Sequence, residues 1–158
     1  MKTMKKTALI RATINSQMKV LHWNAGGLSQ PKMTEIQDIA NKNEIDVILI
    51  NEANVSAENV QYYNIKKFNI YTLNKTRQIA SGILVATKDT LKTKFKIITQ
   101  DNNNTAEMVE ITIWKENKQI KIESVYSPPK NKELQLDKIN ITRATIIRGD
   151  FNAASTTR

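Results

Sequence analysis

The sequence predicts an α/β domain built on mixed β-sheets. Strand-like segments recur along the chain with few helical segments between them. Residues 45–50 are apolar on both faces after Asp46, as is typical of a central strand that is covered on each side. Residues 108–114 and 120–126 form a β-hairpin around residues 116–118, which requires antiparallel pairing. Together these features favour mixed rather than purely parallel sheets.

The first half of the chain predicts a strand, a turn, a helix and the central strand. Residues 19–23 form the first strand and Asn24 lies where it leaves the sheet. A glycine pair follows and favours a turn, because glycine adopts backbone angles that other residues avoid. The helix ends near Asn43, and its signals are an N-cap serine, a first-turn proline and apolar residues at helical spacing: Ser29, Pro31, Ile36, Ile39 and Ala40.

The second half predicts mainly strands. Residues 69–73 and 82–87 are short strands, and residues 101–104 are a polar loop. Prolines end the second arm of the hairpin, since proline lacks the donor that a β-ladder requires. Residues 133–140 are compatible with one short helix, after which the β-branched pair at 146–147 begins a strand that runs to Asp150.

Composition indicates one intracellular domain with a polyanionic partner. The 158 residues suit a single domain with a sizeable core. The net charge of +9 and pI of about 9.7 suit DNA, although a lysine-rich solvated surface is the simpler alternative. No cysteine is present, which excludes disulfides, thiolate zinc sites and a cysteine nucleophile. No apolar run approaches the length of a membrane span, so no membrane partner is expected.

Residues 1–17 are predicted to be a basic, flexible N-terminal extension, and residues 18–158 the domain. No acidic residue precedes Glu35, and the apolar piece at residues 7–10 is too short for a secretory signal. A mitochondrial presequence is an alternative interpretation of this basic segment.

Oxygen-bearing side chains lie at the carboxyl ends of several predicted strands, where open α/β sheets place their ligands. Residues 150 and 152 point to the same side of an extended backbone, which turns Phe151 into the core. Carboxylate and amide oxygens suit Mg²⁺, whereas no His/Cys cluster has the spacing of a zinc site. The candidate site residues are Asn24, Glu52, Tyr126, Asp150 and Asn152.

Each candidate taken alone has a structural explanation. Asp150 can cap a turn, Asn152 can bond local backbone, and Tyr126 can be a core aromatic residue. Glu52 follows a buried strand and must reach either solvent or a partner. Only convergence of these side chains makes a functional site.

Four segments carry a resemblance to a known family: Trp-Asn-Ala-Gly-Gly-Leu at 23–28, Ile-Asn-Glu at 50–52, Val-Tyr-Ser-Pro-Pro at 125–129 and Gly-Asp-Phe-Asn-Ala at 149–153. In this order they resemble the endonuclease/exonuclease/phosphatase superfamily, and in particular the endonuclease domain of non-LTR (LINE-like) retrotransposons. The resemblance implies a DNase I-like, four-layered α/β sandwich of two mixed β-sheets flanked by helices. It also implies a Ser-Asp-His segment after residue 158, so we expect a fold that is incomplete at its C-terminus.

The resemblance further implies a Mg²⁺-dependent endonuclease that nicks a DNA target site, with Mn²⁺ as the alternative ion. Glu52 and Asn24 would hold the metal, Asp150 would activate water, Asn152 would donate to the phosphate, and Tyr126 would steady it. No small-molecule cofactor is implied. We expect a nuclear monomer, once fused to a reverse transcriptase domain.

His22 is the only histidine and shares a strand face with Asn24. The resemblance assigns the catalytic histidine to sequence downstream of residue 158, so His22 is expected to be a non-catalytic strand residue and activity to be impaired. Two positions depart from the superfamily pattern: Gly26, where repair endonucleases carry an acid, and Asn51, where glutamine is commoner.

Two other functions stay open. The same residues could serve an abasic-site nuclease or a phosphomonoesterase of this superfamily. Alternatively, the chain is a non-catalytic, basic nucleic-acid-binding remnant, which would bind DNA in a salt-sensitive manner without turnover.

Overall fold

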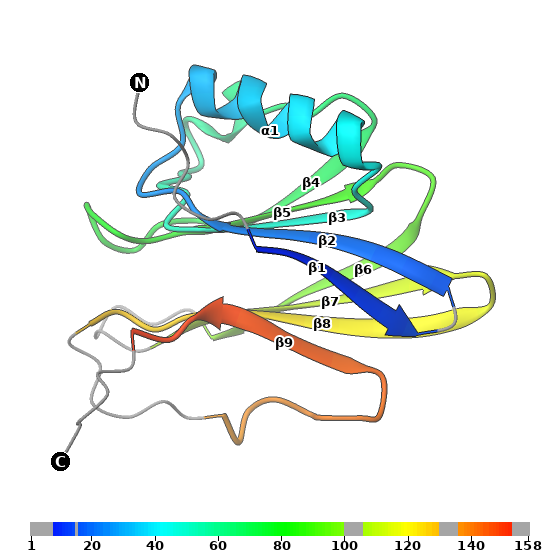
Figure 1. Ribbon diagram of the computed structural model, residues 1–158. Helices are drawn as coiled ribbons and strands as arrows, with labels where there is room; N and C mark the ends of the chain where they lie inside the picture. The colour runs from blue at the N-terminus through cyan, green and yellow to red at the C-terminus, as the bar shows by residue number, and fades with distance from the viewer. Residues whose placement is uncertain (1–7, 15, 100–105, 130–135, 153–158) are drawn as a thin grey trace, which may run out of the picture.

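Two β-sheets pack face to face, with one α-helix on the outside of the first (Figure 1). The computed structural model describes residues 8–14, 16–99, 106–129 and 136–152. Sheet A has the strand order β1-β2-β3-β5-β4 and sheet B the order β6-β7-β8-β9. The strands are β1 (Ala8–Ile14), β2 (Ser16–Asn24), β3 (Val47–Asn51), β4 (Phe68–Leu73), β5 (Ile83–Lys88), β6 (Lys92–Thr99), β7 (Glu107–Lys115), β8 (Lys118–Tyr126) and β9 (Thr145–Asp150).

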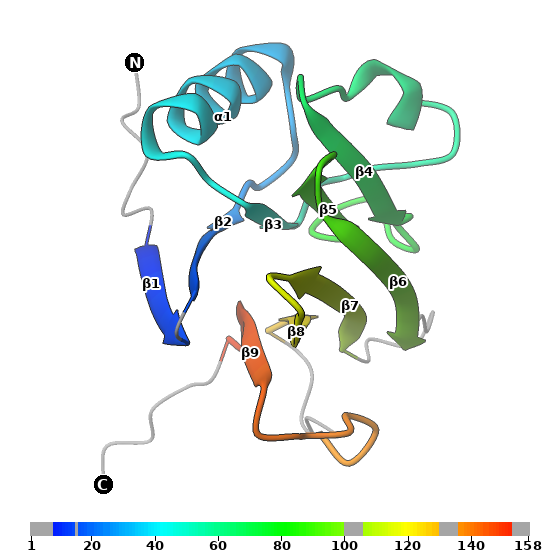
Figure 2. The same ribbon diagram turned by 90° about the vertical axis from the view of Figure 1, so that its right-hand side faces the viewer.

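Each sheet combines one parallel pair with antiparallel pairs, which confirms the prediction of mixed sheets. The parallel pairs are β2 with β3 in sheet A and β8 with β9 in sheet B. Because parallel strands end at the same edge, the carboxyl ends of each pair lie together. In Figure 1 the carboxyl ends of β2 and β9 lie on the same side of the molecule, at the left, and Figure 2 shows sheet A above sheet B from the opposite side.

The core has an inner layer between the sheets and an outer layer under the helix. Residues of β2, β3 and β5 alternate between these layers, with Leu49 and Val85 facing sheet B and Ile48 and Leu84 facing the helix. All of β3 is buried because sheet B covers one face and the helix the other. The predicted central strand is therefore confirmed.

The helix α1 (Gln30–Asn43) confirms the predicted bounds, and a 3-10 turn, η1 (Val60–Tyr62), follows later. Ser29 precedes α1, although its side chain forms no capping hydrogen bond. At the other end Glu44 is left-handed (φ 54°) and its N–H donates to carbonyls of the last turn. Within the described ranges no helix covers the outer face of sheet B, so helices flank the sandwich on one side only. None of the described helices is long and apolar enough to cross a membrane.

The predicted hairpin is confirmed as β7 and β8, with Lys115 paired to Lys118. The connecting residues Glu116 and Asn117 both have positive φ, 50° and 61°, as a type I′ turn requires. Beyond the hairpin, β9 lies parallel to β8, and a Cβ on Gly149 would lie 1.9 Å from a carbonyl oxygen of β8. This glycine is thus required by the neighbouring strand.

Several segments differ from the sequence prediction. Residues 8–14 of the expected flexible extension form β1, antiparallel to β2, while the division into extension and domain stays a prediction. The strand β6 was not predicted. A short helix was predicted at residues 133–140, but residues 136–140 form a turn and residues 133–135 lie outside the described residues. The predicted loop at 101–104 also lies outside the described residues. Phe151 is 36% exposed rather than in the core, because β9 ends at Asp150 and the chain leaves the sheet there.

Candidate active site

Three of the predicted site residues meet at one rim of the sandwich. Asn24 ends β2, Glu52 follows β3, and Asp150 ends β9. The Asn24 side-chain nitrogen Nδ2 lies 3.0 Å from Glu52 Oε1 and 2.7 Å from Asp150 Oδ2. One amide therefore donates to both carboxylates and joins the ends of sheets A and B.

The orientation of the Asn24 amide limits its role. Its oxygen Oδ1 accepts a hydrogen bond from the Gly26 N–H at 3.1 Å, so the nitrogen is the atom that faces the acids. In this orientation Asn24 aligns the two carboxylates, and its oxygen is engaged with the turn that follows β2. The arrangement suits an orienting residue better than a metal ligand.

Asp150 is held at both oxygens. Oδ2 accepts from Asn24, and Oδ1 accepts from the backbone N–H of Asn152 at 3.1 Å. The Asn152 side-chain nitrogen donates to the Ser127 carbonyl at 2.8 Å. Asn152 is thus directed toward the segment after β8, while its backbone supports Asp150.

Tyr126 lies behind the carboxylates in the interior. Its hydroxyl is fully buried beside the Glu52 carboxylate. Burial, followed by the nearby Glu52 carboxylate, raises the pKa of the hydroxyl, whereas the Arg77 guanidinium opposes this shift. The Arg77 guanidinium carbon lies 5.8 Å from the centre of the tyrosine ring. The Tyr126 hydroxyl therefore faces the protein interior rather than solvent.

His22 belongs to a buried polar link between the sheets. Its Nε2 lies 3.2 Å from Asn51 Nδ2, which also donates to the Val125 carbonyl at 2.9 Å. The Ser124 hydroxyl donates to Asn51 Oδ1 at 3.1 Å. Burial, and then Arg148, lower the pKa of His22. His22 forms no hydrogen bond with the Asn24 cluster among the described residues.

Sequence reasoning missed three residues that support the site: Asn51, Arg77 and Glu107. Asn51 was treated only as a departure from a pattern, although a polar residue that ends an apolar strand is a signal of a buried link. Arg77 and Glu107 lie in a loop and at a strand start, far apart in sequence, and no local pattern identifies them.

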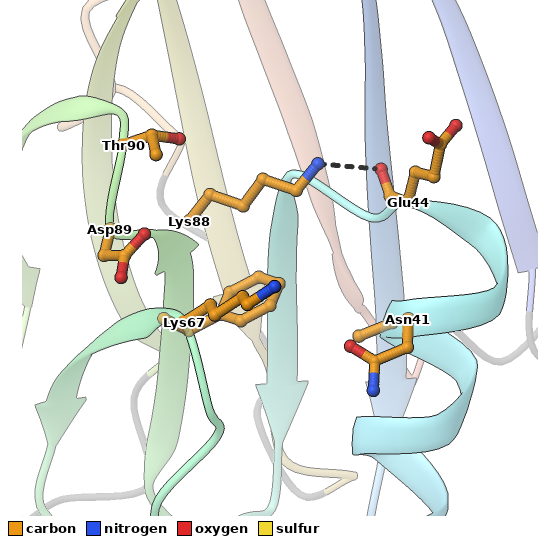
Figure 3. A pocket seen from close by; sticks show the side chains of 8 residues that line it. Asn41, Glu44, Lys67, Lys88, Asp89 and Thr90 are labelled. Carbon is orange, nitrogen blue, oxygen red and sulfur yellow. Dashed lines mark hydrogen bonds between the residues drawn. The ribbon is translucent and has the colours of Figure 1, made fainter.

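One pocket lies at the other end of β3 (Figure 3). It has a volume of about 300 Å³ and lies between the end of α1, the start of β4 and the end of β5. In it the Lys88 ammonium donates to the Glu44 carbonyl at 3.3 Å. We place the candidate site at the carboxylate cluster instead, because side chains from both sheets meet there.

The cluster fits a hydrated Mg²⁺ ion. In the part of the chain that the structure describes, no group of three or more His, Cys, Asp or Glu side chains could hold a metal. Mg²⁺ keeps several waters and is usually bound through one or two carboxylates together with substrate phosphate. Glu52 and Asp150 meet that smaller requirement.

Comparison with known proteins identifies the fold. No protein-family model matches the sequence, and no curated protein matches it. TDP2 of D. rerio, in complex with single strand DNA product, matches with a TM-score of 0.62 at 14% identity, over 87% of this chain and 61% of that chain. The endonuclease domain of TRAS1, a telomere-specific non-LTR retrotransposon, matches with a TM-score of 0.59 at 20% identity, over 88% and 61%. The chain has the endonuclease/exonuclease/phosphatase fold.

A third structure with this fold supports the assignment. An endonuclease/exonuclease/phosphatase family protein from Leptotrichia buccalis C-1013-b matches with a TM-score of 0.55 at 21% identity, over 85% of this chain and 66% of that chain. The predicted resemblance to the endonuclease/exonuclease/phosphatase superfamily is confirmed at the level of fold. The chain spans 61% of the length of both the TDP2 and the TRAS1 chains.

Proposed function

We propose that this chain is a Mg²⁺-dependent endonuclease of the non-LTR retrotransposon type, which hydrolyses phosphodiester bonds in DNA. The observation that carries the proposal is the Asn24 amide, which draws the Glu52 and Asp150 carboxylates from two sheets to one rim. The net charge of +9 favours a polyanionic substrate. The four motifs that resemble non-LTR retrotransposon endonucleases support the retrotransposon type, and the TRAS1 endonuclease domain shares the fold.

Each site residue has a separate role in the in-line attack of water on the phosphate. Glu52 would hold Mg²⁺ or Mn²⁺, and Asn24 keeps its carboxylate aligned. When bound, the ion would act as a Lewis acid on the charge that develops at the scissile phosphate. Asp150 would orient the attacking water and accept its proton, and the oxygen that leaves as the P–O bond breaks would take a proton from solvent water. Asn152 would donate to the phosphate after releasing the Ser127 carbonyl.

His22 bonds to Asn51 between the sheets rather than to the carboxylate cluster, so we assign it no role as the general acid or base.

A nicking assay tests the proposal. The purified chain is incubated with supercoiled plasmid and Mg²⁺, and we expect nicking that EDTA, Glu52→Ala and Asp150→Ala each abolish. Glu35→Ala, on the exposed side of α1, is the matched control and should nick as the wild type does. Nicking that survives both site substitutions would refute the assignment. An abasic duplex and an inositol phosphate, tested in parallel, separate the abasic-site nuclease and phosphomonoesterase alternatives.

A second candidate is a non-catalytic nucleic-acid-binding protein. It is favoured by the buried Tyr126 hydroxyl and by the Asn152 amide, which bonds to backbone. It predicts salt-sensitive DNA binding that persists in both site variants without any nicking. For either function we propose a nuclear monomer, which localisation of a tagged chain and sedimentation of the purified protein would test.

A further inference from the structure

Glu107 begins β7 in sheet B and is a fully buried carboxylate with several partners. Its Oε1 accepts from the Ser81 hydroxyl and from Arg77 Nη2, the latter at 3.2 Å, and its Oε2 accepts from the Gly82 N–H at 2.9 Å. A buried carboxylate requires such donors, because its desolvation is otherwise strongly unfavourable. All three donors belong to the loop between β4 and β5. Glu107 thus anchors that loop to sheet B.

The same loop holds the backbone that follows Glu52. The Ala53 N–H donates to the Gly82 carbonyl, and the Asn54 N–H donates to the Ser81 carbonyl, both at 2.9 Å. Gly82 has a φ of 88°, and a Cβ there would lie 3.2 Å from the backbone nitrogen of Val55. Residues 81 and 82 therefore bond to Glu107 on one side and to residues 53 and 54 on the other.

Glu52 itself has an unusual backbone. Its φ is 49°, in the left-handed region that few residues other than glycine adopt. The Glu52 carbonyl accepts a hydrogen bond from the Gly27 N–H at 2.7 Å. The Ala53 carbonyl accepts one from the Leu28 N–H at 3.1 Å. Such a conformation persists only where the surroundings hold it. The loop that Glu107 anchors and the turn after β2 hold it from two sides.

We infer that Glu107 is a positioning residue for Glu52. It acts through the hydroxyl and backbone of Ser81 and the backbone of Gly82, which keep residues 52–54 in the conformation that directs the Glu52 carboxylate to Asn24. This inference rests on the proposed metal-binding role of Glu52. Residues that orient a metal ligand commonly alter metal affinity by about 10- to 100-fold when they are replaced.

Titration of the full chain with Mn²⁺, followed by the electron paramagnetic resonance signal of the free ion, tests the inference. Glu107→Gln should weaken Mn²⁺ binding about tenfold or more. Ser81→Ala removes one hydrogen bond to Glu107 without a change of charge. It should also weaken Mn²⁺ binding, but by a smaller factor than Glu107→Gln does. The double variant should bind no more weakly than Glu107→Gln alone, since both changes break one path. Glu123→Gln, a buried carboxylate elsewhere in sheet B, is the control and should bind as the wild type does.

The outcomes separate this inference from the proposed function. A wild-type chain that binds no Mn²⁺, or whose affinity survives Glu52→Ala, overturns both. Loss of binding in Glu52→Ala with unchanged binding in Glu107→Gln and Ser81→Ala overturns the inference alone. Thermal unfolding establishes that each variant is folded. If Glu107→Gln does not fold, Ser81→Ala decides: weakened binding supports the inference and unchanged binding overturns it.

Discussion

Replacement of Asn24 by alanine should destabilise the protein through the two carboxylates that it joins. The substitution removes the donor that lies 3.0 Å from Glu52 Oε1 and 2.7 Å from Asp150 Oδ2. A hydrogen bond to a charged group contributes about 1.5–3 kcal/mol. All three residues are half-buried, so water replaces part of what is lost. We therefore expect the free energy of unfolding to fall by about 2 kcal/mol in total, below the sum for two such bonds.

Urea denaturation in metal-free buffer at neutral pH measures this effect. Asn43→Ala is the control: its amide donates to a neutral backbone carbonyl of α1, so the change should be below about 1 kcal/mol. An Asn24→Ala loss no larger than that of Asn43→Ala would refute the charge-based reasoning.

Three further predictions concern stability. Burial lowers the pKa of His22, so as the pH falls below 6.5 the unfolded chain takes up a proton before the folded chain does. The free energy of unfolding should therefore decrease in that range. In urea titrations, His22→Gln should make the free energy of unfolding less dependent on pH there. Burial and Glu110 raise the pKa of Glu123 from 4.5 to about 8. The contribution of Glu123 to the free energy of unfolding is therefore fully present below pH 4.5 and is lost as the pH rises to about 8. Glu123→Gln should therefore match the wild type in acid and exceed its thermal stability at pH 9, and equal curves at both pH values would contradict this. Gly149→Ala places a Cβ 1.9 Å from the Val125 carbonyl oxygen, and chemical denaturation should show a loss of more than about 3 kcal/mol.

The elements that local pattern predicts well are those whose environment is uniform along their length. The central strand β3 is buried on both faces, the helix α1 has its apolar residues on one face, and the β7–β8 hairpin has strongly β-forming arms. The strand β6 escaped prediction because lysines alternate with its inward residues at a sheet edge. Phe151 was misplaced because an alternating pattern cannot reveal where a strand ends.

The sequence by itself determined the α/β class, the mixed sheets and the residue types at the strand ends, because these follow from local periodicity and short motifs. Only the tertiary structure decided which of those side chains meet. Asn24 contacts Asp150 across 126 positions of sequence, whereas Asn152, two residues further on, bonds to backbone. The support that Glu107 provides to Glu52 through a third segment was likewise invisible in the sequence. Such contacts depend on how two sheets pack, and no local pattern along one chain encodes that geometry.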